Sequence, residues 1–504
     1  MSNEPDHTRR WLINVSGAAL LSNAFPVAES HAQSAAAPPP GGARDVPVGT
    51  APERSAVSAV TATLADYVVK TLDRELPAAA VAKTKLHVLD TFAAMVSGSR
   101  LKPGLLAARY VDSLGGKPQA MVIGTGIVTS TVNAALANGM SAHADETDDT
   151  NPVGPFHPGC GAVSAALATA ELAGRSGNDL LRAVALGHDI GARLVLSFGL
   201  GNPTRHSPST LITTFVATAC AAAMLRLDER QVRHALSYAA QQASGLGSWA
   251  RDREHIEKAF DFGGMGARNG VMAATMVAMG CTGVEDIFSG QESAFSALAD
   301  KPAPAALVAE LGSRFDIHTT TIKKWSVGAP LQSVLDSMAV LLEDPAVRAG
   351  AIKHVTVDMS PESFRIVDNS TSPDLCVQHL IALSIVDRGA SFASVHDVAR
   401  MSDPNVLAVR KLVELVPNEE LRTAVPVRQA IVRIETADGR SLSHRTYVVR
   451  GTARNPMEPK EVEAKALDLM APVLGAARAN ELIATVAKLD TFGPVSGLRR
   501  LLQA

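Results

Sequence analysis

The hydrophobic periodicity of this chain changes twice along its 504 residues, and this limits the folds open to it. From residue 57 to 316 apolar residues recur at helical spacing. Between residues 317 and 450 an amphipathic helix and other helical pieces are mixed with segments that alternate like strands. From 451 to 504 the helical spacing returns. The pattern predicts a mainly α-helical protein with a smaller α+β section in its middle.

The first helical section is rich in small residues. Aromatic residues make up 4% of the chain, whereas hydrophobic residues make up 46%, which favours closely packed helices over a β-sandwich. Gly174 is placed to end one helix, and Asn178 or Asp179 to cap the next. The predicted helices are Val132–Ala144, Cys160–Leu172, Leu180–Ser197, Leu211–Arg226 and Glu229–Ala243.

The middle section contains a predicted β-hairpin. Gln429–Glu435 and Ser441–Val449 alternate in hydrophobicity, and the turn between them contains Asp438 and Gly439. An Asp-Gly pair between two alternating runs is a strong hairpin signal.

The N-terminus resembles an export signal. Residues 1–37 contain Thr8-Arg9-Arg10, a weakly apolar run and then small residues, which predicts a twin-arginine signal and a periplasmic protein. Residues 38–56 are rich in Pro, Gly and Ala and are expected to be a linker. The apolar run is too short for a stable membrane span.

Charge and cysteine content exclude several classes of protein. The net charge of −3 gives no electrostatic reason to expect nucleic acid binding. The cysteines at positions 160, 220, 281 and 376 are far apart, so neither a zinc cluster nor a disulfide scaffold is expected.

The stretch Asn138–Glu171, which we call the acidic stretch, contains the largest group of candidate catalytic residues. Glu146, Asp148 and Asp149 lie beside His143, and His157 follows a loop rich in Pro and Gly. Carboxylates this close repel one another, and histidine can transfer protons near neutral pH. The stretch is either an acid/base site or a solvated acidic loop. Its residues could also ligate a divalent metal, but we expect neither a metal nor another cofactor.

Two polar stretches follow. One is a proline-punctuated loop at residues 201–208 that contains His206. In the other, Arg251, Arg253 and Lys258 could neutralise an anionic ligand, although single basic residues are most often solvated.

These stretches together resemble the 2-methylcitrate dehydratase/cis-aconitate decarboxylase (MmgE/PrpD) family. The resemblance covers residues 64–501 and is strongest in AHADETDDT followed by HPG. Further matching motifs are Glu257-Lys258-Ala259-Phe260, Gly280-Cys281-Thr282-Gly283, Ile322-Lys323-Lys324-Trp325 and Asn455-Pro456.

The resemblance implies one large helical domain, made from residues 57–316 and 451–504, with residues 317–450 inserted as a lid. It also implies a homodimer, a site between the domains and a metal-independent lyase that acts on a small polycarboxylate. His157 occupies the catalytic histidine position of the family. Glu146 and Thr150 occupy positions of its acidic residue and threonine, and Lys258 and Lys323 those of its carboxylate-binding lysines.

The chain departs from the family pattern at three positions. Ser207 stands where the family has a histidine before proline, with His206 one place earlier. Gly328 replaces another histidine, and the family's lid tyrosine falls near His379 or Leu380. We therefore consider His206 and His379 as proton donors to a leaving hydroxyl. Two other functions stay open: an epimerase or isomerase of a related dicarboxylic acid, and an exported carboxylate-binding protein without catalysis.

Overall fold

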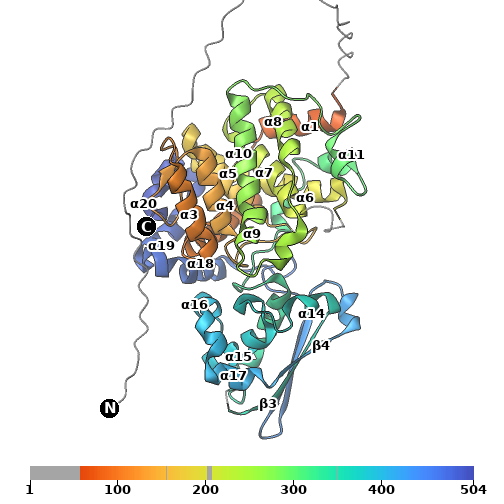
Figure 1. The fold of residues 1–504 in the computed structure, drawn as a ribbon, viewed down its shortest axis with the longest axis vertical. Helices are drawn as coiled ribbons and strands as arrows, with labels where there is room; N and C mark the ends of the chain where they lie inside the picture. The colour runs from red at the N-terminus through yellow and green to blue at the C-terminus, as the bar shows by residue number, and fades with distance from the viewer. Residues whose placement is uncertain (1–56, 155, 201–206, 349) are drawn as a thin grey trace, which may run out of the picture. The chain divides into compact units, whose positions relative to one another are not determined.

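The structure is a computed structural model that describes residues 57–154, 156–200, 207–348 and 350–504 (Figure 1). The predicted signal and linker, and His206, lie outside the described residues. Ala56–Ala504 forms one compact unit. None of the described helices is long and apolar enough to cross a membrane.

The first part of the described chain is helical, as the periodicity predicted (Figure 1). Its longer helices are α1 (Ala59–Val69), α2 (Ala78–Gly98), α3 (Lys102–Leu114), α4 (Thr131–Ala142), α5 (Pro158–Ala173), α6 (Gly177–Phe198), α7 (Pro208–Met224), α8 (Glu229–Gln242) and α10 (Met265–Ala278). Between α3 and α4 lies a short antiparallel pair, β1 (Ala120–Met121) and β2 (Val128–Thr129).

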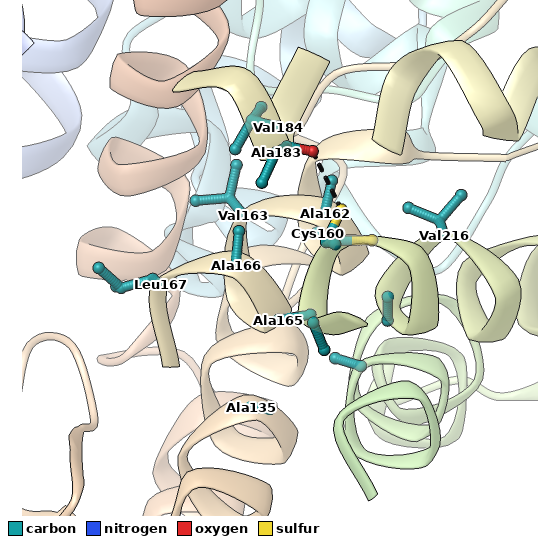
Figure 2. Close-up of a cluster of buried hydrophobic side chains, with 14 of the residues drawn as sticks. Ala135, Cys160, Ala162, Val163, Ala165, Ala166, Leu167, Ala183, Val184 and Val216 are labelled. Carbon is teal, nitrogen blue, oxygen red and sulfur yellow. Dashed lines mark hydrogen bonds between the residues drawn. The ribbon is translucent and has the colours of Figure 1, made fainter. Parts of the chain in front are cut away.

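Small side chains let these helices approach closely. Figure 2 shows alanine and valine side chains of α4, α5, α6 and α7 that fill one part of this core. Where α4 meets the segment before α10, a Cβ at Gly139 would lie 2.6 Å from the Gly263 carbonyl oxygen. This contact therefore requires glycine, and it brings two backbones together at the edge of the acidic stretch.

Helix ends follow local capping rules. Gly174 ends α5 in the left-handed conformation, with a φ of 63°, as expected. The N-cap of α6 is Ser176, not Asn178 or Asp179. Its hydroxyl accepts from the Asp179 N–H, while the Asp179 carboxylate accepts from the Ser176 N–H, so Asp179 acts as the reciprocal partner in a capping box.

The middle section contains a four-stranded mixed sheet of order β4-β3-β5-β6. Its strands are β3 (Ile352–Met359), β4 (Val413–Pro417), β5 (Ala430–Thr436) and β6 (Ser441–Thr446). β3 pairs with β4 in parallel and with β5 antiparallel, and β5 pairs antiparallel with β6. The predicted hairpin is therefore confirmed, and Gly439 takes a φ of 85° in its turn.

Helices accompany this sheet and share a second hydrophobic core with it. They are α13 (Gln332–Leu341), α14 (Pro361–Val367), α15 (Val377–Asp387), α16 (Phe392–His396) and α17 (Pro404–Arg410). The described chain is thus mainly α-helical with a small mixed sheet, in agreement with the predicted fold class. The exact domain boundaries stay a prediction.

The last helices belong to the first core. Buried residues of α18 (Pro459–Leu474), α19 (Ala476–Val486) and α20 (Arg499–Leu502) join the same hydrophobic cluster as α2 and α5. One buried ion pair also connects α18 to α2, because Lys465 Nζ lies 2.6 Å from Asp90 Oδ1. The same ammonium donates to the Thr147 carbonyl at 3.0 Å, so α18 also holds the acidic stretch.

We predict that Lys465→Met lowers the free energy of unfolding by about 3–5 kcal/mol, because it leaves the buried Asp90 carboxylate without its cation. Urea unfolding followed by circular dichroism measures this. Lys460→Met is the matched control, since Lys460 is exposed on the same helix. Equal losses in the two variants would contradict the prediction, and adding Asp90→Asn to Lys465→Met should restore part of the stability.

Candidate active site

The acidic stretch connects α4 to α5 and is buried over most of its length. His143 is the C-cap residue of α4, and His157 is the N-cap residue of α5. Pro158 fits the first position of α5 because that position needs no backbone N–H donor. Residues 143 to 151 are all buried, so the stretch is not a solvated acidic loop.

Asp148 connects the two histidines. His143 Nδ1 lies 3.0 Å from both carboxylate oxygens of Asp148, and His157 Nδ1 lies 2.9 Å from Oδ1. A carboxylate only accepts, so both Nδ1 atoms donate and each ring presents Nε2 on its other side. Burial raises the pKa of Asp148, but the two histidines outweigh this effect and hold it below its usual range.

Aromatic packing fixes both rings. His143 stacks on Phe262 with ring centroids 4.6 Å apart and 3° between the planes. His157 meets His143 edge-on at 4.6 Å. Phe262 belongs to η2 (Phe260–Gly264), one turn of π-helix that continues from α9 (Ile256–Ala259) into α10. Single π-turns inside α-helices are frequent at functional sites.

Asp149 faces a different pair of histidines. Its Oδ2 lies 2.8 Å from His87 Nδ1 and 3.0 Å from His188 Nε2. Its Oδ1 accepts from the Gly159 N–H at 2.9 Å, at the start of α5. His188 Nδ1 also lies 2.9 Å from the Val184 carbonyl oxygen, so both ring nitrogens face acceptors. All three side chains are fully buried, which makes this a structural group.

Glu146 binds the two lysines that the sequence singled out. Lys258 Nζ contacts Glu146 Oε1, and Lys323 Nζ donates to the Glu146 carbonyl at 2.7 Å and lies 3.5 Å from Oε2. Burial raises the pKa of Glu146, but Lys258 and then Lys323 lower it well below its usual range. Glu146 is therefore ionised, and the carboxylate that contacts His157 is that of Asp148 rather than that of Glu146.

A short backbone pairing holds Lys323 beside the acidic stretch. Thr150 and Thr321 form an isolated antiparallel bridge, with N···O distances of 3.0 and 2.8 Å in its two hydrogen bonds. Lys323 Nζ then lies 3.9 Å from Asp148 Oδ1, so the lysine also approaches the carboxylate between the two histidines. The bridge thus places the backbone of Thr150 near Lys323, and a role for the Thr150 side chain stays a prediction.

His255 also lies at this cluster. Its ring centroid is 5.3 Å from that of His143. One nitrogen of each ring and a carboxylate oxygen of Glu146 lie within 4.8 Å of one another. Sequence reasoning named neither His255 nor the bridging role of Asp148, because spacing alone does not show which neighbouring carboxylate or basic residue faces the same space.

His379 and Arg251 lie apart from this cluster. His379 is buried in α15, neither ring nitrogen has a hydrogen-bond partner among the described residues, and burial lowers its pKa to about 4. The charges acting on it come from Arg410, Arg400 and Asp387 rather than from the acidic stretch. Arg251 is exposed at the end of the 3₁₀ turn Gly247–Arg251.

Ser207, the first of the three departures from the family pattern, donates its hydroxyl proton to Asp261, and its N–H donates to the Gly245 carbonyl at 3.0 Å. Burial raises the pKa of Asp261 to about 6. This pair fixes the start of α7 against the π-helical turn.

Three groups in the described chain have ligand atoms close enough to hold a metal ion: His87/Asp149/His188, His143/Glu146/His255 and His143/Asp148/His157. In the first and third, imidazole N–H groups already occupy carboxylate oxygens. In the second, the Lys258 ammonium contacts Glu146 and would repel a cation. The expectation that no metal is needed stays a prediction.

A separate cavity of about 280 Å³ adjoins the segment after Lys323. Its lining includes Lys324, Trp325, Phe392 and Lys465, but none of the histidines and lysines of the cluster. Because histidines and buried carboxylates meet lysines at the cluster, whereas no histidine lines the cavity, we place the chemistry at the cluster.

The fold and the cluster together define a helical protein with a buried histidine–carboxylate–lysine site. The MmgE/PrpD N-terminal domain matches residues 62–306, and the MmgE/PrpD C-terminal domain matches residues 325–491. The chain therefore belongs to the MmgE/PrpD family, as the sequence motifs indicated.

Two curated relatives carry related names. The chain is 27% identical to a cis-aconitate decarboxylase-like protein of Aspergillus oryzae over 254 residues, which cover 47% of this chain and 50% of that protein. It is 24% identical to a cis-aconitate decarboxylase of Mus musculus over 390 residues, which cover 73% of this chain and 78% of that protein.

We predict that the buried His87 makes the protein less stable in mild acid. Burial lowers the pKa of His87 to about 3, whereas an unfolded histidine titrates near 6.5. Below pH 6.5 the unfolded state thus binds more protons, and His87 alone lowers the free energy of unfolding by up to about 1.4 kcal/mol per pH unit.

Urea unfolding at pH 7, 6 and 5 tests this prediction. His87→Gln should show a shallower decline between pH 6 and 5 than the wild type, whatever its stability at pH 7. His354→Gln is the control, because His354 is more than a third exposed. Identical slopes for the wild type and His87→Gln would contradict the assignment.

Proposed function

We propose that this protein is a cofactor-independent lyase that removes a proton alpha to a carboxylate of a di- or tricarboxylic acid. The observation that carries the proposal is the arrangement of His157, oriented by Asp148, beside Lys258 and Lys323. The membership in the MmgE/PrpD family and the names of the two relatives support the class of reaction.

His157 is the proton acceptor in this mechanism. Its Nδ1–H donates to Asp148, so Nε2 holds the free lone pair. The ionised carboxylate of Asp148 stabilises the imidazolium that forms when Nε2 takes the proton. The side chain of His157 is 9% exposed, whereas those of His143 and Asp148 are fully buried, which makes His157 the member of the group that a substrate can reach.

The lysines stabilise the charge that this step creates. Loss of an α-proton turns the carboxylate and its α-carbon into an enediolate-like species with more negative charge on the oxygens. Lys258 and Lys323 converge on Glu146 from separate parts of the chain, which fixes their ammonium groups in one place before substrate binds. Cations fixed in this way favour the transition state over the ground state.

A polycarboxylate suits this charge distribution better than a monoacid. Arg428, in the loop before β5, has a φ of 66°, and the Glu146 carboxylate acts on its charge. Two lysines therefore contact the Glu146 carboxylate, and the charge of a third cation, Arg428, interacts with it. A substrate with two or three carboxylates supplies the negative charge that balances them.

The test of the proposal is a screen of the purified protein against citrate, 2-methylcitrate, cis-aconitate and substituted succinates in deuterated water, followed by proton NMR. Solvent exchange, elimination, decarboxylation and epimerisation each give different spectra. Conversion of any of these acids with loss of water or carbon dioxide supports the lyase. Exchange with inversion and no elimination would instead identify an epimerase, and binding without exchange a carboxylate-binding protein.

We predict that His157→Gln lowers kcat by about 10²–10⁴ on the acid found in the screen, because the proton acceptor is lost. Lys258→Ala and Lys323→Ala should lower kcat as well as weaken binding, since the charge they meet grows in the transition state. Steady-state kinetics measures both effects. Lys353→Ala is the control, because Lys353 is an exposed lysine on β3. A folded His157→Gln variant with near-normal kcat would remove His157 from this role.

We also propose that residues 1–37 direct export of the folded protein by the twin-arginine route. Replacing both Arg9 and Arg10 by lysine should retain the protein in the cytoplasm, because the signal depends on the arginine pair. Cell fractionation of the full chain measures this, and an unchanged location would refute the proposal.

A further inference from the structure

His255 occupies an unusual backbone conformation directly before the helix that carries Lys258. It is the N-cap residue of α9 and has a φ of 60° and a ψ of 14°. Non-glycine residues adopt this left-handed conformation infrequently, and such conformations cluster at functional sites. The conformation directs the His255 ring to the cluster, where its centroid lies 5.3 Å from that of His143.

The His255 ring carries a polar atom that has no partner in the part of the chain that the structure describes. His255 Nε2 is buried and has no hydrogen bond among the described residues. Two nearby groups are in the same state: His143 Nε2, and Trp249 Nε1, whose ring contacts Phe262 edge-on at 4.7 Å. Buried polar atoms are rarely left unpaired, so three of them around Phe262 and Lys258 indicate a place where a polar ligand binds.

His255 and His157 differ in their surroundings. His157 has an aspartate on Nδ1, which suits it to take up a proton. His255 has no hydrogen-bonded carboxylate; burial and then Lys258 lower its pKa to about 4. The carboxylates of a bound polyanion would neutralise the lysines and favour the protonated form of His255. The two histidines are thus suited to opposite halves of an acid–base reaction.

We propose that His255 is the general acid that completes elimination of water from a β-hydroxy di- or tricarboxylate, an inference that rests on the proposed lyase function. His157 Nε2 takes the α-proton, and the C–H electron pair first enters the enediolate-like species and then forms the new C=C bond. The C–O bond to the hydroxyl breaks, and His255 donates its proton to that oxygen, which leaves as water. The proton on His157 then returns to solvent and His255 is reprotonated from solvent, so no oxidant, reductant or metal is required.

The test uses His255→Asn in the full-length protein, because asparagine tolerates the left-handed conformation and the variant should fold. His318→Asn is the matched control, since His318 is an exposed histidine outside the site. Both are assayed in deuterated water with the hydroxy acid that the wild type converts. Proton NMR follows elimination and α-hydrogen exchange in the remaining substrate.

We expect His255→Asn to lower the rate of elimination by about 10²–10⁴, the usual contribution of a general acid. Exchange of the α-hydrogen should stay within a few-fold of the wild type, because His157 and Asp148 are unchanged. A variant whose elimination is near normal overturns the proposal. So does a parallel loss of elimination and exchange, which would place His255 in proton abstraction or in positioning of the substrate. A wild type that only decarboxylates also overturns the proposal, whereas one that neither exchanges, eliminates nor decarboxylates any of the acids overturns the lyase function itself.

Discussion

The structure around the acidic stretch depends on the neutralisation of two adjacent buried carboxylates. Asp148 and Asp149 are both fully buried, and each accepts hydrogen bonds from two histidines. A buried charge without partners is very costly, so the four histidines, which come from four different helices or helix ends, must meet at this point for the chain to fold. The histidine pair on Asp149 is fully buried, while the pair on Asp148 lies beside Glu146 and the lysines.

The two neighbouring aspartates therefore have different roles: Asp149 supports the fold, and Asp148 orients the proton acceptor. Asp149 fixes the start of α5 through the Gly159 N–H, and Lys465 holds the preceding loop through the Thr147 carbonyl. A further ion pair reaches the loop from α16, where His396 Nε2 lies 2.7 Å from Asp145 Oδ2. The loop that contains Asp145 and Thr147 is thus held by Lys465 of α18 and by His396 of α16. A site whose supports are rigid can place its proton acceptor accurately.

Much of the fold could be predicted from the sequence because hydrophobic periodicity is a local property. The helical sections, the β5–β6 hairpin and the C-cap at Gly174 all follow from patterns a few residues long. The sequence motifs also located His157, Lys258 and Lys323, and the structure brings the two lysines to Glu146. Pairings between distant residues could not be predicted in this way. Asp90 and Lys465 are 375 residues apart, and only the fold shows that Asp148, not Glu146, orients His157.

The π-helical turn η2 makes the site sensitive to chain length as well as to residue type. Its i+5 hydrogen bond, from the Met265 N–H to the Phe260 carbonyl, accommodates one residue more than an α-helix would. Each α-helical residue turns the chain by about 100°. Loss of one residue from this turn would therefore rotate Lys258 and His255 about the helix axis while α10 kept its packing against α7. The extra residue therefore determines how Lys258 and His255 are rotated about the helix axis relative to α10. Deletion of one residue from η2 would leave the other side chains of the cluster unchanged in type. Lys258 and His255 would nevertheless no longer face the remaining residues of the cluster.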